Sequence, residues 1–359
     1  MNEMMTEKSI MKIQTVTHSR LSQIDFNNIP FGKVFTDHMF QADYYDGAWK
    51  NPRIEPYGKL ELSPSISSLH YGQSVFEGMK SNRDAEGNAL LFRADMNFKR
   101  INNSCRRMAI PELPKSFFMD GLRNLIKLDK NWIPTSEGSA LYLRPLVFAT
   151  MEHVGVKVAD RYKFVIIASP VGPYYGHTVK VKVADRYVRA FRGGTGFAKA
   201  AGNYGATLLP MEQAHKEGYD QILWLDGYNF EYIHEIGTMN VFFQVGEKVL
   251  TPSTESGEIL PGVTRNSAIQ LLEDNGFQIE DRPVRISEII DAAEKGILKD
   301  AFGTGTAAAI AQIASIGYKG KDYVLPPVNE RTVSNFLKRN LIGIRTGEVA
   351  DPYGWIEKI

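Results

Sequence analysis

Apolar and polar positions alternate along the chain with two different periods. Residues 115–128 repeat apolar side chains with the spacing of a helix that buries one face, whereas residues 139–150 and 162–168 are rich in β-formers. Residues 89–92 form a short apolar run that predicts a strand, and Asp95 follows it at a position suited to a helix N-cap. Strand and helix signals therefore alternate through the first half of the chain.

Residues 169–176 interrupt this pattern with two prolines and two glycines, which predicts a linker. Beyond it, the pattern predicts strands over residues 221–225, 240–245 and 248–250, and helices over residues 264–275 and 287–296. The organisation predicted is an N-terminal extension with a candidate mobile start over residues 1–30, a small α/β domain over 31–170, a linker over 171–178 and a large domain over 179–359.

The composition is that of a soluble globular protein: of 359 residues, 43% are hydrophobic and 23% are charged. A net charge of +1 gives no electrostatic footprint for nucleic acid or an anionic membrane. Cys105 is the one cysteine, so no internal disulfide can form, which fits a reducing compartment. No stretch approaches the ~20 apolar residues that span a bilayer, and residues 1–20 lack the apolar core of a secretory signal. We therefore expect a cytoplasmic protein.

Lys199 lies in a glycine-rich segment, residues 192–205, among small and apolar neighbours. Glycines let backbone approach a ligand closely, and exclusion of water favours the neutral amine, which is the nucleophile. Such an amine can form a Schiff base, for which its pKa must fall from an ordinary ~10.4 towards neutrality. For this segment taken alone, a solvated lysine in a flexible loop is the competing interpretation.

Four further features suggest a phosphate-bearing ring held by that lysine. Glu235 precedes a tight turn and could face a buried ligand, although most carboxylates of this kind are solvated. Residues 259–267 place a Pro-Gly turn before a predicted helix start, which can bind an anion or simply carry a capping threonine. Residues 302–310 place glycines and hydroxyls before what we predict to be an apolar helix. Arg93 follows a predicted strand and could fork onto phosphate oxygens or remain a surface arginine.

Together these features predict pyridoxal phosphate as the cofactor and no metal. That cofactor requires a Schiff-base lysine, an acidic partner for its pyridinium nitrogen and donors for its phosphate. The carboxylate keeps the ring nitrogen protonated, so that the ring accepts electrons when the substrate Cα loses its proton. The same lysine, once released, is positioned as the general base.

The motifs at these positions resemble those of branched-chain amino acid aminotransferases, which are fold-type IV pyridoxal-phosphate enzymes. The resemblance is carried by residues 31–39, 69–80, 141–145, 202–205, 235–240, 260–265 and 303–307, in family order. It extends from about Phe31 to near the C-terminus and is highly specific when the segments are taken together. It implies an α/β (α+β) fold of two domains with the cofactor in the interdomain cleft, residues 179–359 as the cofactor-binding domain, and a homodimer.

The resemblance also implies roles for individual residues. Lys199 would form the Schiff base and shuttle the proton, Tyr204 would bind the cofactor's phenolic oxygen, and Glu235 would pair with the pyridine nitrogen. The phosphate would be held by Arg93, Val263, Thr264 and Thr306, and Arg189 would be a further arginine on the cofactor side. The substrate α-carboxylate would meet Thr238 and Ala307. An apolar pocket would be walled by Phe31, Phe76, Tyr142 and Tyr174, with Tyr71 reaching in from the partner subunit and Arg144 accepting the distal carboxylate of glutamate.

The implied reaction is a reversible ping-pong transfer of the amino group of L-leucine, L-isoleucine or L-valine to 2-oxoglutarate. An apolar pocket separates these three substrates poorly, because a methylene is worth only ~1–3 kcal/mol. Larger animal relatives carry a Cys-x-x-Cys pair after the Gly-Thr-Gly-Thr segment, whereas residues 307–311 here contain no cysteine. We therefore predict no thiol–disulfide switch at this place.

Four other functions compete with this interpretation. A D-amino acid aminotransferase or an aminodeoxychorismate lyase would share the lysine and the glutamate, but residues 69–80 and 141–145 argue against both. A cofactor-binding or regulatory protein could keep the fold without turnover. A nucleotide-phosphate binder would need a Gly-Lys-Ser/Thr signature that the glycine-rich turns lack.

Overall fold

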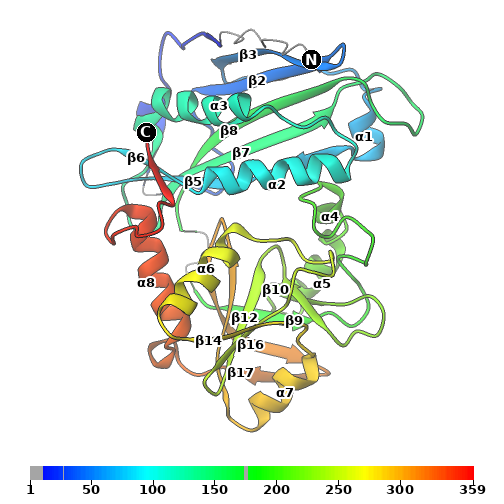
Figure 1. Ribbon diagram of the computed structural model, residues 1–359, viewed down its shortest axis with the longest axis vertical. Helices are drawn as coiled ribbons and strands as arrows, with labels where there is room; N and C mark the ends of the chain where they lie inside the picture. The colour runs from blue at the N-terminus through cyan, green and yellow to red at the C-terminus, as the bar shows by residue number, and fades with distance from the viewer. Residues whose placement is uncertain (1–10, 27, 174–176) are drawn as a thin grey trace, which may run out of the picture. The chain divides into compact units, whose positions relative to one another are not determined.

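The computed structural model describes residues 11–26, 28–173 and 177–359 (Figure 1). The chain divides into two compact units, one of Met1–Gly172 with Lys358–Ile359, the other of Pro173–Glu357. The division falls within the segment that the two prolines and two glycines mark in the sequence. Tyr174, a predicted pocket residue, lies outside the described residues.

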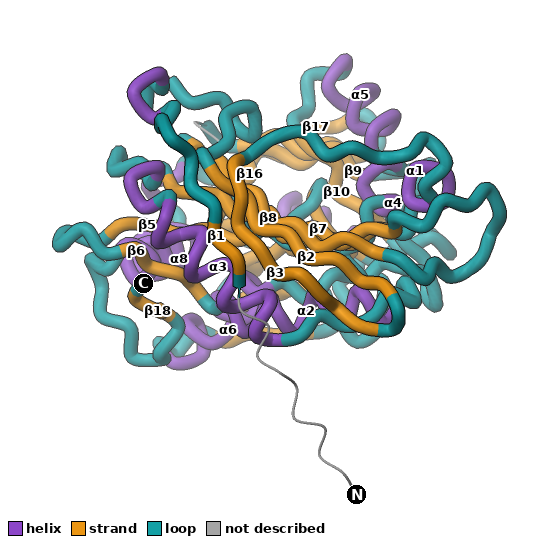
Figure 2. The backbone as a smooth tube through the Cα atoms, turned by 90° about the horizontal axis from the view of Figure 1, so that it is seen from above, coloured by secondary structure: helices purple, strands orange, loops and turns teal. Residues whose placement is uncertain are grey.

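The first unit is built on a nine-stranded sheet whose path has the order β1-β3-β2-β8-β7-β5-β6-β18, with β4 paired to β7. Its elements are β1 (Lys12–Ile13), η1 (Leu21–Gln23), β2 (His38–Tyr45), β3 (Ala48–Pro56), α1 (Ser67–Tyr71), β4 (Ser74–Phe76), β5 (Met79–Arg83), β6 (Ala89–Phe92), α2 (Ala94–Arg107), α3 (Lys115–Leu128), η2 (Lys130–Trp132), β7 (Ala140–Ala149), β8 (Tyr162–Val171) and β18 (Ile356–Lys358). The long central strands are antiparallel, and Figure 2 shows β3, β2, β8 and β7 side by side.

Helix α3 covers this sheet because its apolar side chains recur on one face. Phe118, Leu122 and Leu125 are fully buried, and the helix packs against β2 and β3. Gly121 allows the close approach, since a Cβ there would lie 3.1 Å from the ring of Phe40 on β2. The described part of the N-terminal extension also joins this unit, where β1 pairs with β3 in parallel.

The second unit is built on another nine-stranded sheet, with the path β11-β10-β9-β16-β15-β12-β13-β14 and β17 paired to β16. Its elements are β9 (Val179–Val183), α4 (Gly202–Gly205), α5 (Leu208–Lys216), β10 (Gln221–Leu225), β11 (Ile233–Ile236), β12 (Asn240–Val245), β13 (Lys248–Thr251), α6 (Val263–Asp274), β14 (Gln278–Asp281), α7 (Ile286–Glu294), β15 (Leu298–Gly305), β16 (Ala309–Tyr318), β17 (Lys321–Val324), η3 (Val328–Glu330) and α8 (Val333–Thr346). A bridge between Ile236 and Met239 joins β11 to β12, so the sheet curls back on itself.

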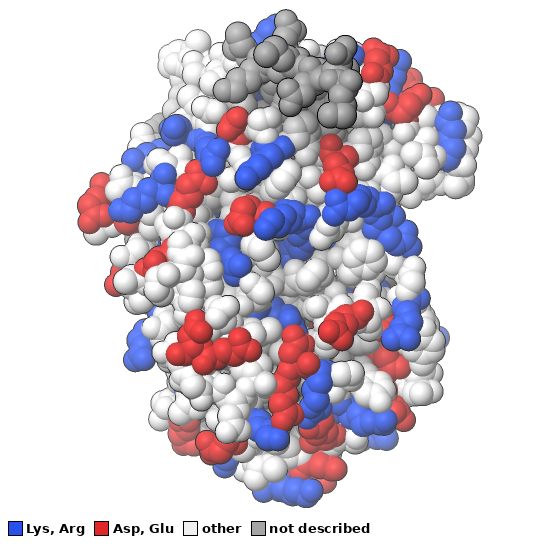
Figure 3. All heavy atoms as spheres, viewed as in Figure 1, with Lys and Arg blue, Asp and Glu red and all other residues white. Residues whose placement is uncertain are grey.

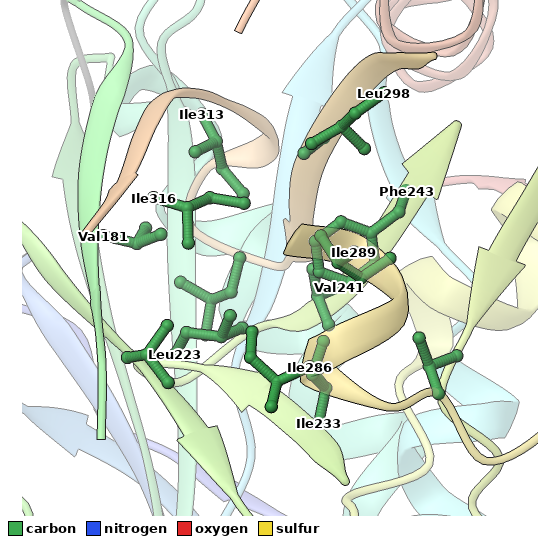
Figure 4. Close-up of a cluster of buried hydrophobic side chains, with 14 of the residues drawn as sticks. Val181, Leu223, Ile233, Val241, Phe243, Ile286, Ile289, Leu298, Ile313 and Ile316 are labelled. Carbon is green, nitrogen blue, oxygen red and sulfur yellow. The ribbon is translucent and has the colours of Figure 1, made fainter. Parts of the chain in front are cut away.

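The core of the second unit lies inside this curl. Val181, Leu223 and Val241 come from three different strands, and Ile289 of α7 packs among them (Figure 4). All four side chains are fully buried. This apolar interior fixes which face of each strand turns outward, and therefore fixes the direction of the polar side chains that alternate with it.

Several predicted elements are confirmed and one is wrong. The structure has α3, β6, β10 and β12 over the ranges that the sequence pattern predicts. The helix predicted after Thr306 is instead strand β16, which pairs antiparallel with β15. A short apolar run without polar interruptions fits a buried strand as well as a buried helix, and here the pairing with β15 decides.

Two boundaries also differ from the prediction. Arg93, not Asp95, occupies the N-cap of α2, and Asp95 lies in the first helical turn, where an acidic side chain still favours the helix dipole. Strand β8 continues to Val171, because its pairing with β7 runs on through Pro170. The proline-containing break therefore begins later than the prolines suggest.

The surface carries both signs of charge in close alternation. On the face drawn in Figure 3, Lys and Arg are interspersed with Asp and Glu, as the net charge of +1 leads one to expect. No helix within the described part of the chain has the length and hydropathy needed to cross a membrane.

Candidate active site

Lys199 and Tyr204 form a hydrogen-bonded pair at the start of α4. The Nζ of Lys199 donates to the phenolic oxygen of Tyr204 at 2.7 Å. The buried Asn203 side chain fixes the loop before them, since its amide donates to the carbonyls of Thr195 at 2.8 Å and Ala198 at 2.9 Å. Side-chain hydrogen bonds within residues 195–204, rather than a regular element, therefore hold the loop that carries the lysine. Asn203 is a positioning residue to which sequence reasoning assigned no role.

Glu235 is a buried carboxylate on β11 with three kinds of donor around it. One oxygen accepts the backbone N–H of Leu260 at 2.9 Å and the side-chain amide of Asn240 at 3.4 Å. The other lies 2.8 Å from Nε of Arg189, and both side chains of this ion pair are at most 7% exposed. A buried carboxylate needs this compensation, because an unpaired charge in such a place is costly.

Arg189 connects this carboxylate to the loop that carries Lys199. Its Nη2 donates to the carbonyl of Glu258 and, at 3.4 Å, to that of Gly196. A side chain at position 196 would not fit, since its Cβ would lie 2.3 Å from the same Glu258 carbonyl. Arg189 thus connects the buried carboxylate of Glu235 to the loop that carries Lys199, all within the second unit.

A tight turn between β11 and β12 presents Thr238 at its tip. Gly237 has φ +52°, a backbone conformation that favours glycine. Its N–H donates to the carbonyl of Ile222 at 2.7 Å and its carbonyl accepts from the indole of Trp224 at 3.0 Å. Both hydrogen-bonding groups of the Gly237 backbone are therefore used, which fixes the backbone next to the exposed Thr238.

The predicted phosphate residues of the second unit occupy a helix start and a hairpin turn. Val263 and Thr264 are the first two residues of α6, whose N-cap is Gly262. Backbone N–H groups at such a position have no partner inside the helix and carry positive partial charge. Thr306 and Ala307 lie in the turn between β15 and β16. Arg345, which sequence reasoning missed, donates from Nη2 to the hydroxyl of Thr264 at 3.0 Å.

The first unit brings four predicted substrate residues together. The guanidinium of Arg144 lies over the ring of Phe76 at 4.5 Å and donates to the hydroxyl of Tyr142 at 2.8 Å. The ring of Phe31 meets that of Tyr142 edge-on at 5.3 Å. Gly78 leaves room for this cluster, since a Cβ there would lie 2.2 Å from the Tyr142 hydroxyl.

The two remaining predicted residues of the first unit lie at the ends of helices. Arg93 sits at the N-cap of α2 in a left-handed conformation with φ +48°. Non-glycine residues rarely adopt this conformation, which the surrounding structure must stabilise. Tyr71 is the last residue of α1 and is 41% exposed in the single chain.

Possible metal ligands and two buried titratable side chains complete the description of the chemistry. Within residues 11–26, 28–173 and 177–359, no group of three His, Cys, Asp or Glu side chains is arranged to hold a metal ion. Cys105 is buried on α2, and burial raises the pKa of its thiol to about 12. His234 is buried beside Glu235 in sequence, and burial together with Arg189 lowers its pKa to about 4.

Comparison with known proteins identifies the family of this chain. Residues 74–316 match the family described as amino-transferase class IV. The chain is 46% identical to a protein of Staphylococcus epidermidis named probable branched-chain-amino-acid aminotransferase, covering 92% of this chain and 93% of that one. It is 43% identical to branched-chain-amino-acid transaminase 1 of Bacillus subtilis, covering 93% and 95%.

Solved structures show the same fold. A branched-chain aminotransferase of Thermoproteus uzoniensis, solved with norvaline, superposes with a TM-score of 0.73 at 23% identity, covering 89% of this chain and 99% of that one. The enzyme of Escherichia coli superposes with a TM-score of 0.71 at 24% identity, covering 88% and 98%. The chain therefore belongs to the class-IV aminotransferases, which are pyridoxal-phosphate-dependent transaminases.

Proposed function

We propose that this protein reversibly transfers the amino group of L-leucine, L-isoleucine or L-valine to 2-oxoglutarate. The observation that carries the proposal is the connected group of Lys199, Tyr204, Arg189 and Glu235, in which a lysine amine and a buried carboxylate are fixed to one loop. The names of the relatives at 43% and 46% identity point to the same reaction.

The donor set fits pyridoxal phosphate. When bound, this cofactor supplies the electron sink that lets the substrate Cα lose its proton. Lys199 then takes that proton on Nζ and returns it, as general base and general acid. The Tyr204 hydroxyl, 2.7 Å away, orients this amine. Glu235 holds a proton at the ring nitrogen, with Arg189 fixing the carboxylate in one orientation.

We assign the phosphate to Arg93, Val263, Thr264 and Thr306. Support comes from the helix start at Val263 and Thr264, where backbone N–H groups point along the helix axis and attract anions. Thr306 adds a hydroxyl from the β15–β16 turn. Arg93 adds a guanidinium that can donate two charge-assisted hydrogen bonds to phosphate oxygens. Each of these groups is suited to a dianion rather than to a neutral ligand.

We assign the substrate side chain to Phe31, Phe76 and Tyr142, together with Tyr174. Aromatic rings of this kind bury an aliphatic side chain without distinguishing leucine from isoleucine. Arg144 lies against the same rings, and one of its five donors is used by Tyr142. Its other N–H groups can donate to the distal carboxylate of glutamate, which would let one pocket take both an apolar and an acidic substrate.

We assign binding of the substrate α-carboxylate to Thr238 and Ala307. We also propose that the protein is a homodimer in which Tyr71 of one copy completes the site of the other. The exposed ring of Tyr71 in the single chain suits a residue that serves a neighbouring copy. We propose the cytoplasm as the compartment, where the one cysteine stays reduced.

The test is an absorption spectrum of the purified protein with pyridoxal phosphate, before and after L-leucine. We expect the visible band of the bound cofactor to disappear with L-leucine and to return with 2-oxoglutarate, which shows both half-reactions. A band that ignores L-leucine and responds to D-alanine would instead establish a D-amino acid aminotransferase, and pyruvate release from aminodeoxychorismate would establish a lyase. Absence of any band at saturating cofactor would reject the cofactor assignment.

A further inference from the structure

Arg345 is a buried cation at the start of helix α6. It lies in the last turn of α8, is 6% exposed, and its Nη2 donates to the Thr264 hydroxyl at 3.0 Å. Thr264, 4% exposed, is the second residue of α6. The two residues are 81 positions apart in the sequence, and the packing of α6 on α8 brings them together.

A cation at this end of a helix is electrostatically unusual. The first turn of a helix carries positive partial charge, so cations are favoured at helix C-termini and disfavoured at N-termini. Arg345 lies at the C-terminus of α8, where a cation is favoured, and also at the N-terminus of α6, where a cation is disfavoured. Burial lowers the pKa of Arg345 to about 10, which indicates that water does little to screen its charge. An anion bound at the first N–H groups of α6 is attracted by the helix start and by the guanidinium together.

The hydrogen bond also orients the Thr264 hydroxyl. Its oxygen accepts from Arg345, so the hydroxyl hydrogen must point away from the guanidinium. A threonine whose acceptor side is occupied in this way is held as a donor. That is the state in which a hydroxyl binds a phosphate oxygen, which only accepts.

We propose that Arg345 is a positioning residue for the cofactor phosphate, which it serves by fixing the Thr264 hydroxyl as a donor and by adding positive charge behind the first turn of α6. The inference rests on the proposed function and on the assignment of the phosphate to Thr264. It concerns the phosphate alone, so Arg345 selects the phosphorylated cofactor over pyridoxal, which has the same ring and aldehyde without the phosphate.

The experiment compares binding of these two compounds to the apoprotein. Dissociation constants for pyridoxal phosphate and pyridoxal are measured by quenching of tryptophan fluorescence for the wild-type protein, Arg345→Gln, Arg345→Lys and the control Arg339→Gln. Arg339 is an exposed arginine on the same helix. We expect Arg345→Gln to weaken pyridoxal phosphate binding about tenfold or more and pyridoxal binding less than about twofold. Arg345→Lys should recover part of the loss, and Arg339→Gln should change neither constant.

Equal weakening of both compounds by Arg345→Gln would overturn the proposal, because it would mean that Arg345 only holds α8 against α6. No weakening of either would overturn it as well. If Arg345→Gln fails to fold, the ratio of the two constants in Arg345→Lys decides in the same way. A wild-type protein that binds no pyridoxal phosphate would refute the proposed function itself, whereas active wild type with an unchanged ratio in the variants would refute the role of Arg345 alone.

Discussion

Glu77, beside the proposed substrate residue Phe76, offers the sharpest test of how the first unit is held together. Its side chain is 0% exposed and forms a two-pronged ion pair with Arg100 of α2, with Nε at 2.7 Å and Nη2 at 2.8 Å from the two carboxylate oxygens. The amide of Asn97 adds a third donor at 2.7 Å. The change Glu77→Gln removes the negative charge and leaves the guanidinium buried.

The expected magnitude follows from burial. Breaking a buried pair by removing one partner costs about 3–5 kcal/mol of unfolding free energy, because the other charge remains in a dry place. Glu112→Gln is the matched control, since Glu112 pairs with Arg106 of the same helix at 2.7 Å but both side chains are about half exposed. Exposed pairs contribute only about 0–1 kcal/mol. The two variants should therefore differ by roughly 3 kcal/mol although their ion-pair distances are the same.

The assay is urea unfolding of both variants and the wild type, with hydrogen exchange of the α2 amides by mass spectrometry to assign the loss to the first unit. The double variant Glu77→Met with Arg100→Met should recover part of the stability, because it removes both buried charges. A Glu77→Gln variant as stable as Glu112→Gln would refute the reasoning. So would a double variant whose loss of unfolding free energy equals the sum of the losses measured for Glu77→Met and Arg100→Met singly.

Three further predictions concern single residues. Lys199→Ala should lower leucine-dependent glutamate formation by about 10²–10⁴-fold or more while circular dichroism stays unchanged, and sustained turnover near the wild-type rate would exclude Lys199 as the general base. The folded pKa of His234, about 4, lies below its ordinary 6.5, so the unfolded chain binds the proton more tightly and stability falls as the pH drops from 6.5 towards 4. The wild type should lose about 2 kcal/mol of unfolding free energy between pH 7 and pH 5 through this group, and His234→Phe should remove that part of the slope. Cys105 should resist a thiol reagent until the protein unfolds, because its thiol is buried with a pKa of about 12, and rapid labelling of the native protein would contradict this.

The sequence predicts elements well where periodicity and length agree. The helix over residues 115–128 is amphipathic along its whole length, and the structure has α3 over that range. The run after Thr306 carries no such signal, because its alanines and isoleucines are buried on both faces of β16. Only the pairing with β15, which depends on contacts distant in sequence, distinguishes strand from helix there.

The site was accessible from sequence as far as its members lie in short motifs. Lys199 and Tyr204 are five residues apart and their hydrogen bond follows from one local turn. Arg345 belongs to no motif, since its contact with Thr264 depends on how α8 packs against α6. The burial of Arg345 in the structure is what marks it as a candidate. Neither the composition nor the spacing of residues in the sequence predicts that an arginine is buried.

The return of the chain end to the first unit has a consequence for synthesis. Ile359 donates its N–H to the carbonyl of Ala89 at 2.9 Å, and Lys358 pairs with Asp84 at 3.2 Å, so the edge of the first sheet is completed by residues translated after the whole of the second unit. When residues 1–172 have emerged from the ribosome, that edge strand has not yet been synthesised. The nascent first unit therefore exposes the open edge of β6 while the second unit is still being made, and β18 can cover that edge only once residues 356–358 have been synthesised.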